Sequence, residues 1–168
     1  MMKKPAVILV LIVSICCAAC GHYLELGTPE KIAEVYCANE EYFNTAVETI
    51  LEYQKVEPML YICPIEEAWE SDVYVGKEIN GLYIESRSLL TDSDYQILSD
   101  AFTPLMERCP FSGVDMHASW VVFTLEGPTY GSAAELYYFP DTDFAAEYTA
   151  QSSYLMITPH WYATIWND

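Results

Sequence analysis

Apolar residues recur every three to four positions between residues 28 and 54, which is the spacing of one helix face. They are Ile32, Val35, Tyr36, Phe43, Ala46, Val47, Ile50 and Leu51. Thr28, Pro29 and Glu30 supply a capping hydroxyl, a proline tolerated in the first turn, and an acid favoured at the positive end of the dipole. We therefore expect a helix over residues 28–54, with a break near Asn39.

A second helical pattern covers residues 92–108. The apolar positions at helical spacing are Tyr95, Leu98, Phe102, Leu105 and Met106. Thr91 precedes the segment and can cap it. Pro104 lies inside the segment and has no N–H to donate, so we expect a kink or a restart there.

Between these helices the apolar period changes to two, which indicates strands. Residues 59–62 form a short apolar run of the kind found in buried strands. Asn80 and Gly81 readily adopt the two positive φ values of a type I′ turn, and apolar residues alternate on both sides of them. Those residues are Val73, Val75, Ile79, Leu82 and Ile84. We expect a hairpin there.

The chain after Pro110 again has the pattern of strands. The expected strands are 117–126, 134–139, 154–158 and 161–166, with loops at 127–128, 131–132 and 141–143. Runs of strands with segregated helices favour an α+β fold. We expect an antiparallel sheet of about five to seven strands, with both helices packed mainly on one face, in a single domain over residues 28–168.

The first twenty residues have the pattern of a secretory signal. They read MMKKPAVILVLIVSICCAAC, with Lys3 and Lys4 before an apolar run and small residues at its end. The run is shorter than the roughly 20 residues that a transmembrane helix needs. We therefore leave residues 1–19 out of the fold.

Ala18, Ala19, Cys20 and Gly21 resemble the lipobox of bacterial lipoproteins, in which small residues precede a cysteine that is lipidated. The resemblance implies cleavage before Cys20, a diacylglyceryl thioether on its sulfur, and a protein held at the extracytoplasmic face of the cell membrane by its acyl chains. Residues 20–27 would form a short tether. Cys17 departs from the pattern, which usually has an aliphatic residue there. An ordinary secreted protein and an uncleaved anchor are the alternatives.

The net charge argues against nucleic acids as partners and limits how the protein can attach to a membrane. The chain has 25 acidic and 7 basic residues, a formal charge of -18. Nucleic-acid binding through phosphate neutralisation needs clustered positive charge, so no nucleic acid is expected as a partner. Removing residues 1–19 takes away Lys3 and Lys4 but no acid, so the charge becomes -20. Anionic headgroups repel such a surface, and the lipid must supply the attachment.

Three cysteines remain after Cys20, namely Cys37, Cys63 and Cys109. An odd number permits at most one intramolecular disulfide. Cys63 and Cys109 both precede a proline at the end of an expected element, so they are the preferred pair. Buried free thiols are the alternative.

The chain has none of the serine motifs typical of hydrolases. Asp115, His117 and Cys109 are the nearest approach to a catalytic set, with Cys63 and His160 as a further pair, but nothing in the sequence places either set together. We assign no catalytic residue.

Two pairs of aspartates resemble calcium ligands only superficially. Asp92 with Asp94, and Asp141 with Asp143, lack the glycine and the distal glutamate of an EF-hand loop. We expect a helix start at the first pair and a turn at the second, and we predict no metal and no cofactor.

Aromatic residues near the C-terminus offer a clue to binding. In a strand over 161–166, Tyr162 and Trp166 share one face. With Tyr137 and Tyr154 they would form a ligand platform for a sugar or peptide. The alternative is that helices bury both faces of the sheet.

The C-terminal part resembles the tail of small uncharacterised proteins of Gram-positive bacteria. The resemblance rests on Val121-Val122-Phe123, Gly131, Leu136-Tyr137-Tyr138 and Trp161-Tyr162. It implies a strand-rich end and no activity.

These observations favour a membrane-anchored, non-enzymatic binding module with a cationic protein, a cationic peptide or a surface glycan as partner. Its acidity and its many Tyr and Trp residues are typical of recognition surfaces. The alternatives are an inhibitor or immunity-like protein, and a small extracytoplasmic hydrolase.

Overall fold

The computed structural model describes residues 26–55, 57, 59–68, 75–87, 90–125, 132–150 and 153–167. The expected signal peptide and Cys20 lie outside these residues. The helices are α2 (Pro29–Tyr53), α3 (Asp92–Arg108) and α4 (Thr142–Thr149), with a 3₁₀ turn at Ile65–Glu67. The strands are β1 (Leu60–Pro64), β2 (Val75–Ile79), β3 (Leu82–Ser86), β4 (Phe111–Met116), β5 (Val121–Leu125), β6 (Ser132–Tyr138), β7 (Leu155–Met156) and β8 (Trp161–Asn167).

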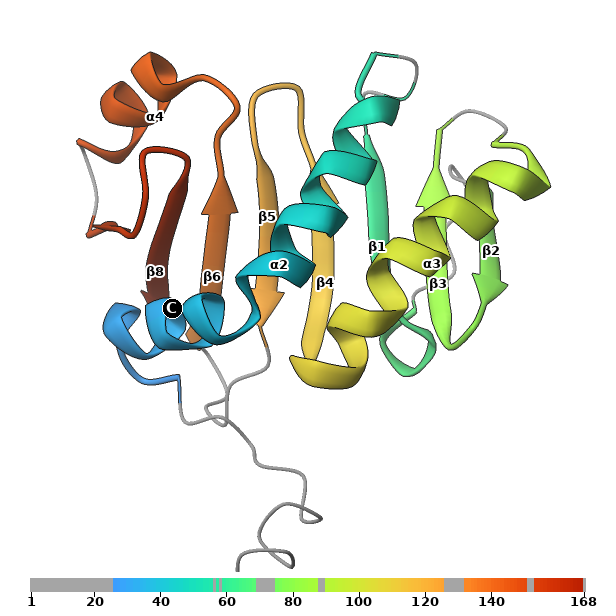
Figure 1. Ribbon diagram of the computed structural model, residues 1–168, viewed down its shortest axis with the longest axis horizontal. Helices are drawn as coiled ribbons and strands as arrows, with labels where there is room; N and C mark the ends of the chain where they lie inside the picture. Colours follow the sequence, from blue (N-terminus) through green and yellow to red (C-terminus); the bar gives the residue numbers. More distant parts are fainter. Residues whose placement is uncertain are drawn as a thin grey trace, which may run out of the picture.

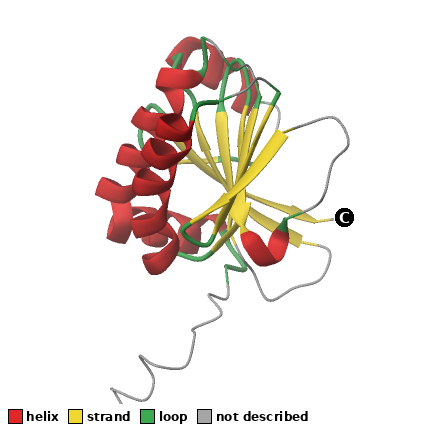
Figure 2. Cartoon of the chain, turned by 90° about the vertical axis from the view of Figure 1, so that its right-hand side faces the viewer, coloured by secondary structure: helices red, strands yellow, loops and turns green. Residues whose placement is uncertain are grey.

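The strands form one open antiparallel sheet in the order β2-β3-β1-β4-β5-β6-β8-β7. Helices α2 and α3 lie side by side on one face of it (Figures 1 and 2). The expected α+β class is confirmed. The sheet has eight strands rather than five to seven, and the described residues contain a third α-helix.

The additional strand is β4, which the sequence pattern did not reveal. Its pairing with β5 shifts register between Phe111 and Gly113, so Ser112 is an extra residue in the strand. A bulge of this kind breaks the alternation on which strand prediction depends. The expected strand from residue 117 begins at Val121, because His117 to Trp120 form the β4–β5 turn, closed by a bond from the His117 N–H to the Trp120 carbonyl (2.8 Å).

Helix α2 has the expected break at Asn39, whose φ of −131° and ψ of 20° are not helical. The side chain of Asn39 donates to the carbonyl of Val35 (2.9 Å), which satisfies an acceptor at the break. A bond from the Gln54 side chain to the His117 carbonyl (2.8 Å) ties the C-terminal end of α2 to the β4–β5 turn.

Helix α3 begins with a capping box, in which the side chains of Thr91 and Asp94 each accept the other's backbone N–H. The expected kink or restart at Pro104 is not seen as an interruption, since α3 continues to Arg108. The carbonyl that Pro104 leaves without its helical donor belongs to Asp100, which is exposed and can be hydrated.

The expected hairpin is present. Asn80 (φ 51°) and Gly81 (φ 84°) form the two-residue turn between β2 and β3. This follows directly from the freedom of Asn and Gly to adopt positive φ.

Helix α4 occupies residues where a loop was expected. The Asp141 carboxylate accepts the N–H groups of Asp143 and Phe144, at 2.9 and 3.0 Å, and so caps the helix. An eight-residue helix is too short to show a clear helical period of apolar residues, and Asp141 and Asp143 are also typical of loops. The expectation of a loop at 141–143 was therefore wrong.

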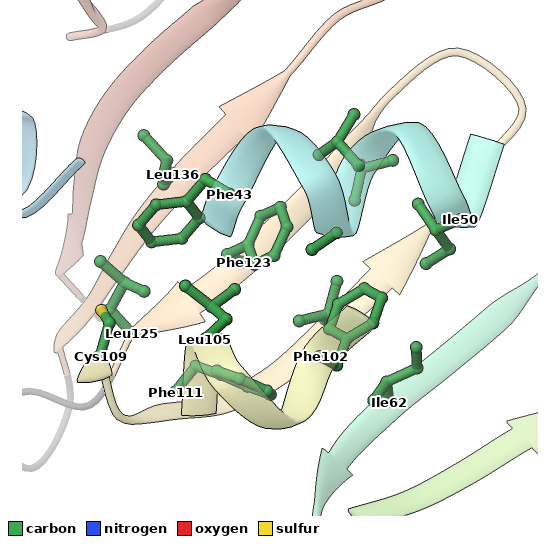
Figure 3. Close-up of a cluster of buried hydrophobic side chains, with 14 of the residues drawn as sticks. Phe43, Ile50, Ile62, Phe102, Leu105, Cys109, Phe111, Phe123, Leu125 and Leu136 are labelled. Atoms are coloured by element: carbon green, nitrogen blue, oxygen red, sulfur yellow. The ribbon is translucent and has the colours of Figure 1, made fainter. Parts of the chain in front are cut away.

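The main core lies between α2, α3 and the sheet (Figure 3). Its largest fully buried rings are Tyr36, Phe43, Phe102, Phe111 and Phe123. A smaller cluster lies on the opposite face, which we call the second face. There Ala145 of α4 packs with Val122, Tyr137, Phe139 and Tyr162. Helices α2 and α3 thus cover most of one face of the sheet, and α4 covers the second face only over β5, β6 and β8.

Candidate functional site

A cavity of about 200 Å³ lies at the end of the sheet where β1 begins and β4 ends. We call it the β1–β4 cavity. Its lining residues are Met59, Leu60, Tyr61, Glu85, Asp115, Met116 and His117. The side chains of Leu60 and Met116 belong to the core between the helices and the sheet, so the cavity combines the Met59 side chain with two carboxylates, a phenol and an imidazole.

The strand register places the polar residues of the cavity in one row. Tyr61 of β1 pairs with Glu85 of β3 on one side and with Asp115 of β4 on the other. Directly paired residues of antiparallel strands point to the same face, about 5 Å apart at their Cα atoms. The backbone positions of Glu85 and Asp115 are therefore about 10 Å apart, with Tyr61 between them.

The Tyr61 ring lies close to the sheet surface, against a glycine. A Cβ atom added at Gly113 would stand 2.8 Å from Cε2 of Tyr61 and 2.9 Å from its hydroxyl, so the ring occupies the place of a side chain. Tyr83 of β3 is seated in the same way over Gly76 of β2, where an added Cβ would overlap its phenol. Tyrosine rings over strand glycines are a recognised way of stabilising a sheet.

Burial dominates the electrostatics of this site. Desolvation raises the pKa of Asp115 above its usual range, and nearby His117 opposes part of this effect. Desolvation also raises the pKa of Tyr61. Cys63, adjacent to Tyr61 on the second face, has its pKa raised to about 11, mainly by burial. The Cys63 thiol therefore keeps its proton at neutral pH and is a poor nucleophile.

Aromatic rings lead from the cavity to α4. The His117 ring packs on Trp120, with centroids 4.9 Å apart, and Trp120 packs on Phe144 and Tyr148 of α4 at 6.1 and 5.2 Å. The His117 backbone is fixed by its bonds to Gln54 and Trp120. The imidazole is thus held at the rim of the cavity by both sides of the turn.

Replacing Asp115 by Asn should make the protein more stable at neutral pH. The pKa of Asp115 is higher in the folded chain than in the unfolded chain. At pH values just above the usual pKa of a carboxyl group, the folded chain therefore binds more protons than the unfolded chain. Stability therefore falls as pH rises through this window, and the loss persists above it. The neutral amide avoids this cost, which we expect to be about 1 kcal/mol. Urea denaturation at several pH values measures it.

Glu135 keeps part of the pH dependence in that variant, because burial raises its pKa in the same direction. Asp100→Asn is the matched control, since Asp100 is exposed on α3 and an amide oxygen can still accept the bond from Gln96. Equal pH profiles for Asp115→Asn and the parent protein would contradict the assignment of a cost to Asp115.

The structure separates the cysteines that were expected to pair. Cys63 and Cys109 are both buried free thiols. Cys109 belongs to the core between helices and sheet, whereas Cys63 alternates with Ile62 and so points to the second face. The preferred disulfide is therefore not formed, because the sheet lies between the two sulfur atoms. Cys37 is exposed on α2.

Two of the three candidate hydrolase residues come together. Asp115 and His117 line the cavity, while Cys109 lies before β4, at the opposite end of that strand and on the helix side. Cys63 and His160 are also apart, because three strands separate β1 from β8. Nδ1 of His160 instead donates to the Phe139 carbonyl oxygen at 2.8 Å.

The expected aromatic platform is divided between buried and exposed positions. Tyr137 and Tyr162 are each 6% exposed beside α4, and Tyr154 is half-buried, with its ring 5.4 Å from that of Tyr137. Trp166 lies farther along β8 and is 48% exposed. The side chains that face solvent are thus Trp166 and part of Tyr154.

The aspartate pairs have local roles. Asp92 forms an ion pair with Lys77 (2.6 Å), Asp94 caps α3, and Asp141 caps α4. Within the described residues there is no group of three side chains suited to holding a metal ion.

Sequence reasoning missed Tyr61, Glu85 and Gly113 as site residues. The signal was weak: Tyr61 alternates with buried residues in LYICP, but its neighbours come from strands that are distant in sequence. Only the order β3-β1-β4 brings Glu85 and Asp115 to its two sides.

Comparison with protein-family models, curated proteins and solved structures gave no match. Within the described residues, no helix combines the length and the apolar character needed to cross a bilayer. Fold and site together define an α+β protein with a small acidic and aromatic cavity at one end of an open antiparallel sheet.

Proposed function

We propose that the protein is a lipid-anchored, extracytoplasmic binding module whose β1–β4 cavity receives a positively charged group of a peptide or protein partner. The observation that carries this proposal is the row Glu85, Tyr61 and Asp115, in which the strands on both sides of Tyr61 each contribute a carboxylate to the lining of one cavity.

The charge of the whole chain supports a cationic partner. A charge of -20 after residue 19 attracts positively charged molecules over about a Debye length and raises their rate of encounter. The cavity then supplies a short-range contact in which water is partly excluded and charge pairs are stronger. Asp115 is half-buried and its pKa is raised by desolvation, and carboxylates with perturbed pKa values are concentrated at functional sites.

The anchoring part of the proposal rests on the sequence of the first twenty residues. Lys3, Lys4, the apolar run and the lipobox-like Ala18-Ala19-Cys20-Gly21 support export and lipidation. An inhibitor that binds a basic surface would use the same site. The protonated Cys63 thiol favours binding over nucleophilic catalysis.

The test is calorimetric titration of the full chain in detergent with a blocked hexapeptide of alternating Gly, Lys and Arg residues. We expect binding that weakens with salt and falls at least about tenfold in the double variant Glu85→Gln, Asp115→Asn. The matched control is Asp100→Asn with Glu147→Gln, which removes the same charge from exposed positions on α3 and α4. The proposal fails if the parent does not bind, or if the control loses as much affinity.

A further inference from the structure

We propose that the β1–β4 cavity selects a guanidinium, the head group of an arginine side chain, over the ammonium group of lysine. This rests on the function proposed above and names the ligand group at that same site. Three features of the cavity carry the inference: its aromatic wall, the spacing of its carboxylates, and its size.

The aromatic wall suits a planar cation. Tyr61 starts between the two acidic positions, and its ring extends across to β4, where it is held low over Gly113, two residues from Asp115, rather than free to turn outward. A guanidinium is flat and weakly hydrated, and it stacks on aromatic rings more readily than a compact, strongly hydrated ammonium does.

The spacing of the carboxylates suits a cation with donors on more than one edge. Glu85 and Asp115 originate about 10 Å apart, on strands that flank β1. An ammonium must be within about 3 Å of both carboxylates to bond to both. A guanidinium has five N–H donors around its rim, so it can bond to carboxylates on opposite sides while its face covers Tyr61.

The size and the rim of the cavity suit one side chain of a larger partner. About 200 Å³ is below the usual range for small-molecule sites, roughly 300 to 1,000 Å³. Met59 lines the cavity and is 37% exposed, so its side chain can pack against the methylene groups of an arginine. A bond from the Met59 N–H to the Glu57 carboxylate (3.3 Å) helps to hold this rim in place.

The test uses the full chain and three blocked pentapeptides that differ only at the central residue, which is Arg, Lys or citrulline. Citrulline has the shape of arginine but no charge. We expect the arginine peptide to bind about tenfold more tightly than the lysine peptide, and the citrulline peptide to bind weakest. Equal or tighter binding of the lysine peptide would overturn the guanidinium inference and leave the cationic binding function standing. Equal binding of arginine and citrulline peptides would overturn both.

Variants of the aromatic wall give the second readout, which is the ratio of arginine to lysine affinity. Tyr61→Leu should bring the ratio close to one, whereas Tyr61→Phe should keep it. Gly113→Ala leaves the tyrosine intact but displaces its ring, because the new Cβ would stand 2.8 Å from Cε2, and it should also lower the ratio.

Tyr83→Leu is the matched control, since Tyr83 has the same seat over a glycine but does not line the cavity. Thermal unfolding of each variant checks that it is folded under the conditions of the binding measurement. A ratio that stays unchanged in folded Tyr61→Leu, or that falls equally in Tyr83→Leu, overturns the inference.

Discussion

Replacing Phe123 by Ala is expected to destabilise the protein by about 3 to 5 kcal/mol, the usual cost of removing a fully buried aromatic ring. Phe123 is 0% exposed, and its ring lies 5.2 Å from that of Phe43 on α2, 6.3 Å from Phe102 on α3 and 5.9 Å from Trp161 on β8. It therefore joins both helices to the sheet, and the resulting space cannot be filled by one neighbour moving. The midpoint of urea denaturation, read by tryptophan fluorescence, measures the loss.

Phe144→Ala is the control for that prediction. Phe144 is a half-buried residue of α4 at the edge of the smaller cluster, and its neighbours are on the second face. We expect a loss of about 1 to 2 kcal/mol there. Similar losses of unfolding free energy in the two variants would contradict the conclusion that Phe123 joins both helices to the sheet.

Replacing Cys20 by Ala is expected to abolish membrane attachment through lipid. Two or three acyl chains give stable anchoring at about 0.8 kcal/mol for each buried methylene, and the acidic surface offers no electrostatic substitute. In a bacterium that makes lipoproteins, mass spectrometry of the N-terminal peptide should show the lipid mass on Cys20 in the parent and none in the variant.

Cys17→Ala is the matched control, because the proposed cleavage before Cys20 would remove Cys17 with residues 1–19. It should leave the lipid on Cys20 unchanged. Recovery of the parent protein with an unmodified Cys20 in the soluble fraction would overturn the anchoring proposal. Residues 16, 17 and 20 lie outside the described residues, so this experiment rests on the sequence alone.

Long periodic segments and strong turn signals allowed most of the fold to be predicted. Helices α2 and α3 differ from their expected bounds by at most a residue, and the Asn39 break and the Asn80-Gly81 turn are both present. The short elements failed for physical reasons. The bulge at Ser112 hid β4, and Asp141 caps a helix too short to show a period.

The candidate site was predictable only in the part that lies on one strand. Asp115 and His117 are two residues apart, so they come together at the end of β4 once that strand forms. Tyr61 and Glu85 join them because β1 inserts between β3 and β4, which no local pattern records. Cys109 was grouped with them because it is near in sequence, although it ends α3 on the helix side.

The direction of α2 determines how far the β1–β4 cavity lies from the N-terminal segment. Helix α2 is bent at Asn39; its C-terminal end reaches the β4–β5 turn through Gln54, while its first turn lies at the opposite end of the sheet (Figure 1). Cys20 precedes the buried Leu26 by six residues, a reach of at most about 20 Å. Under the lipid anchoring proposed above, the bilayer would lie at the end of the sheet where α2 begins, and the β1–β4 cavity would face away from it, toward molecules arriving from the surroundings.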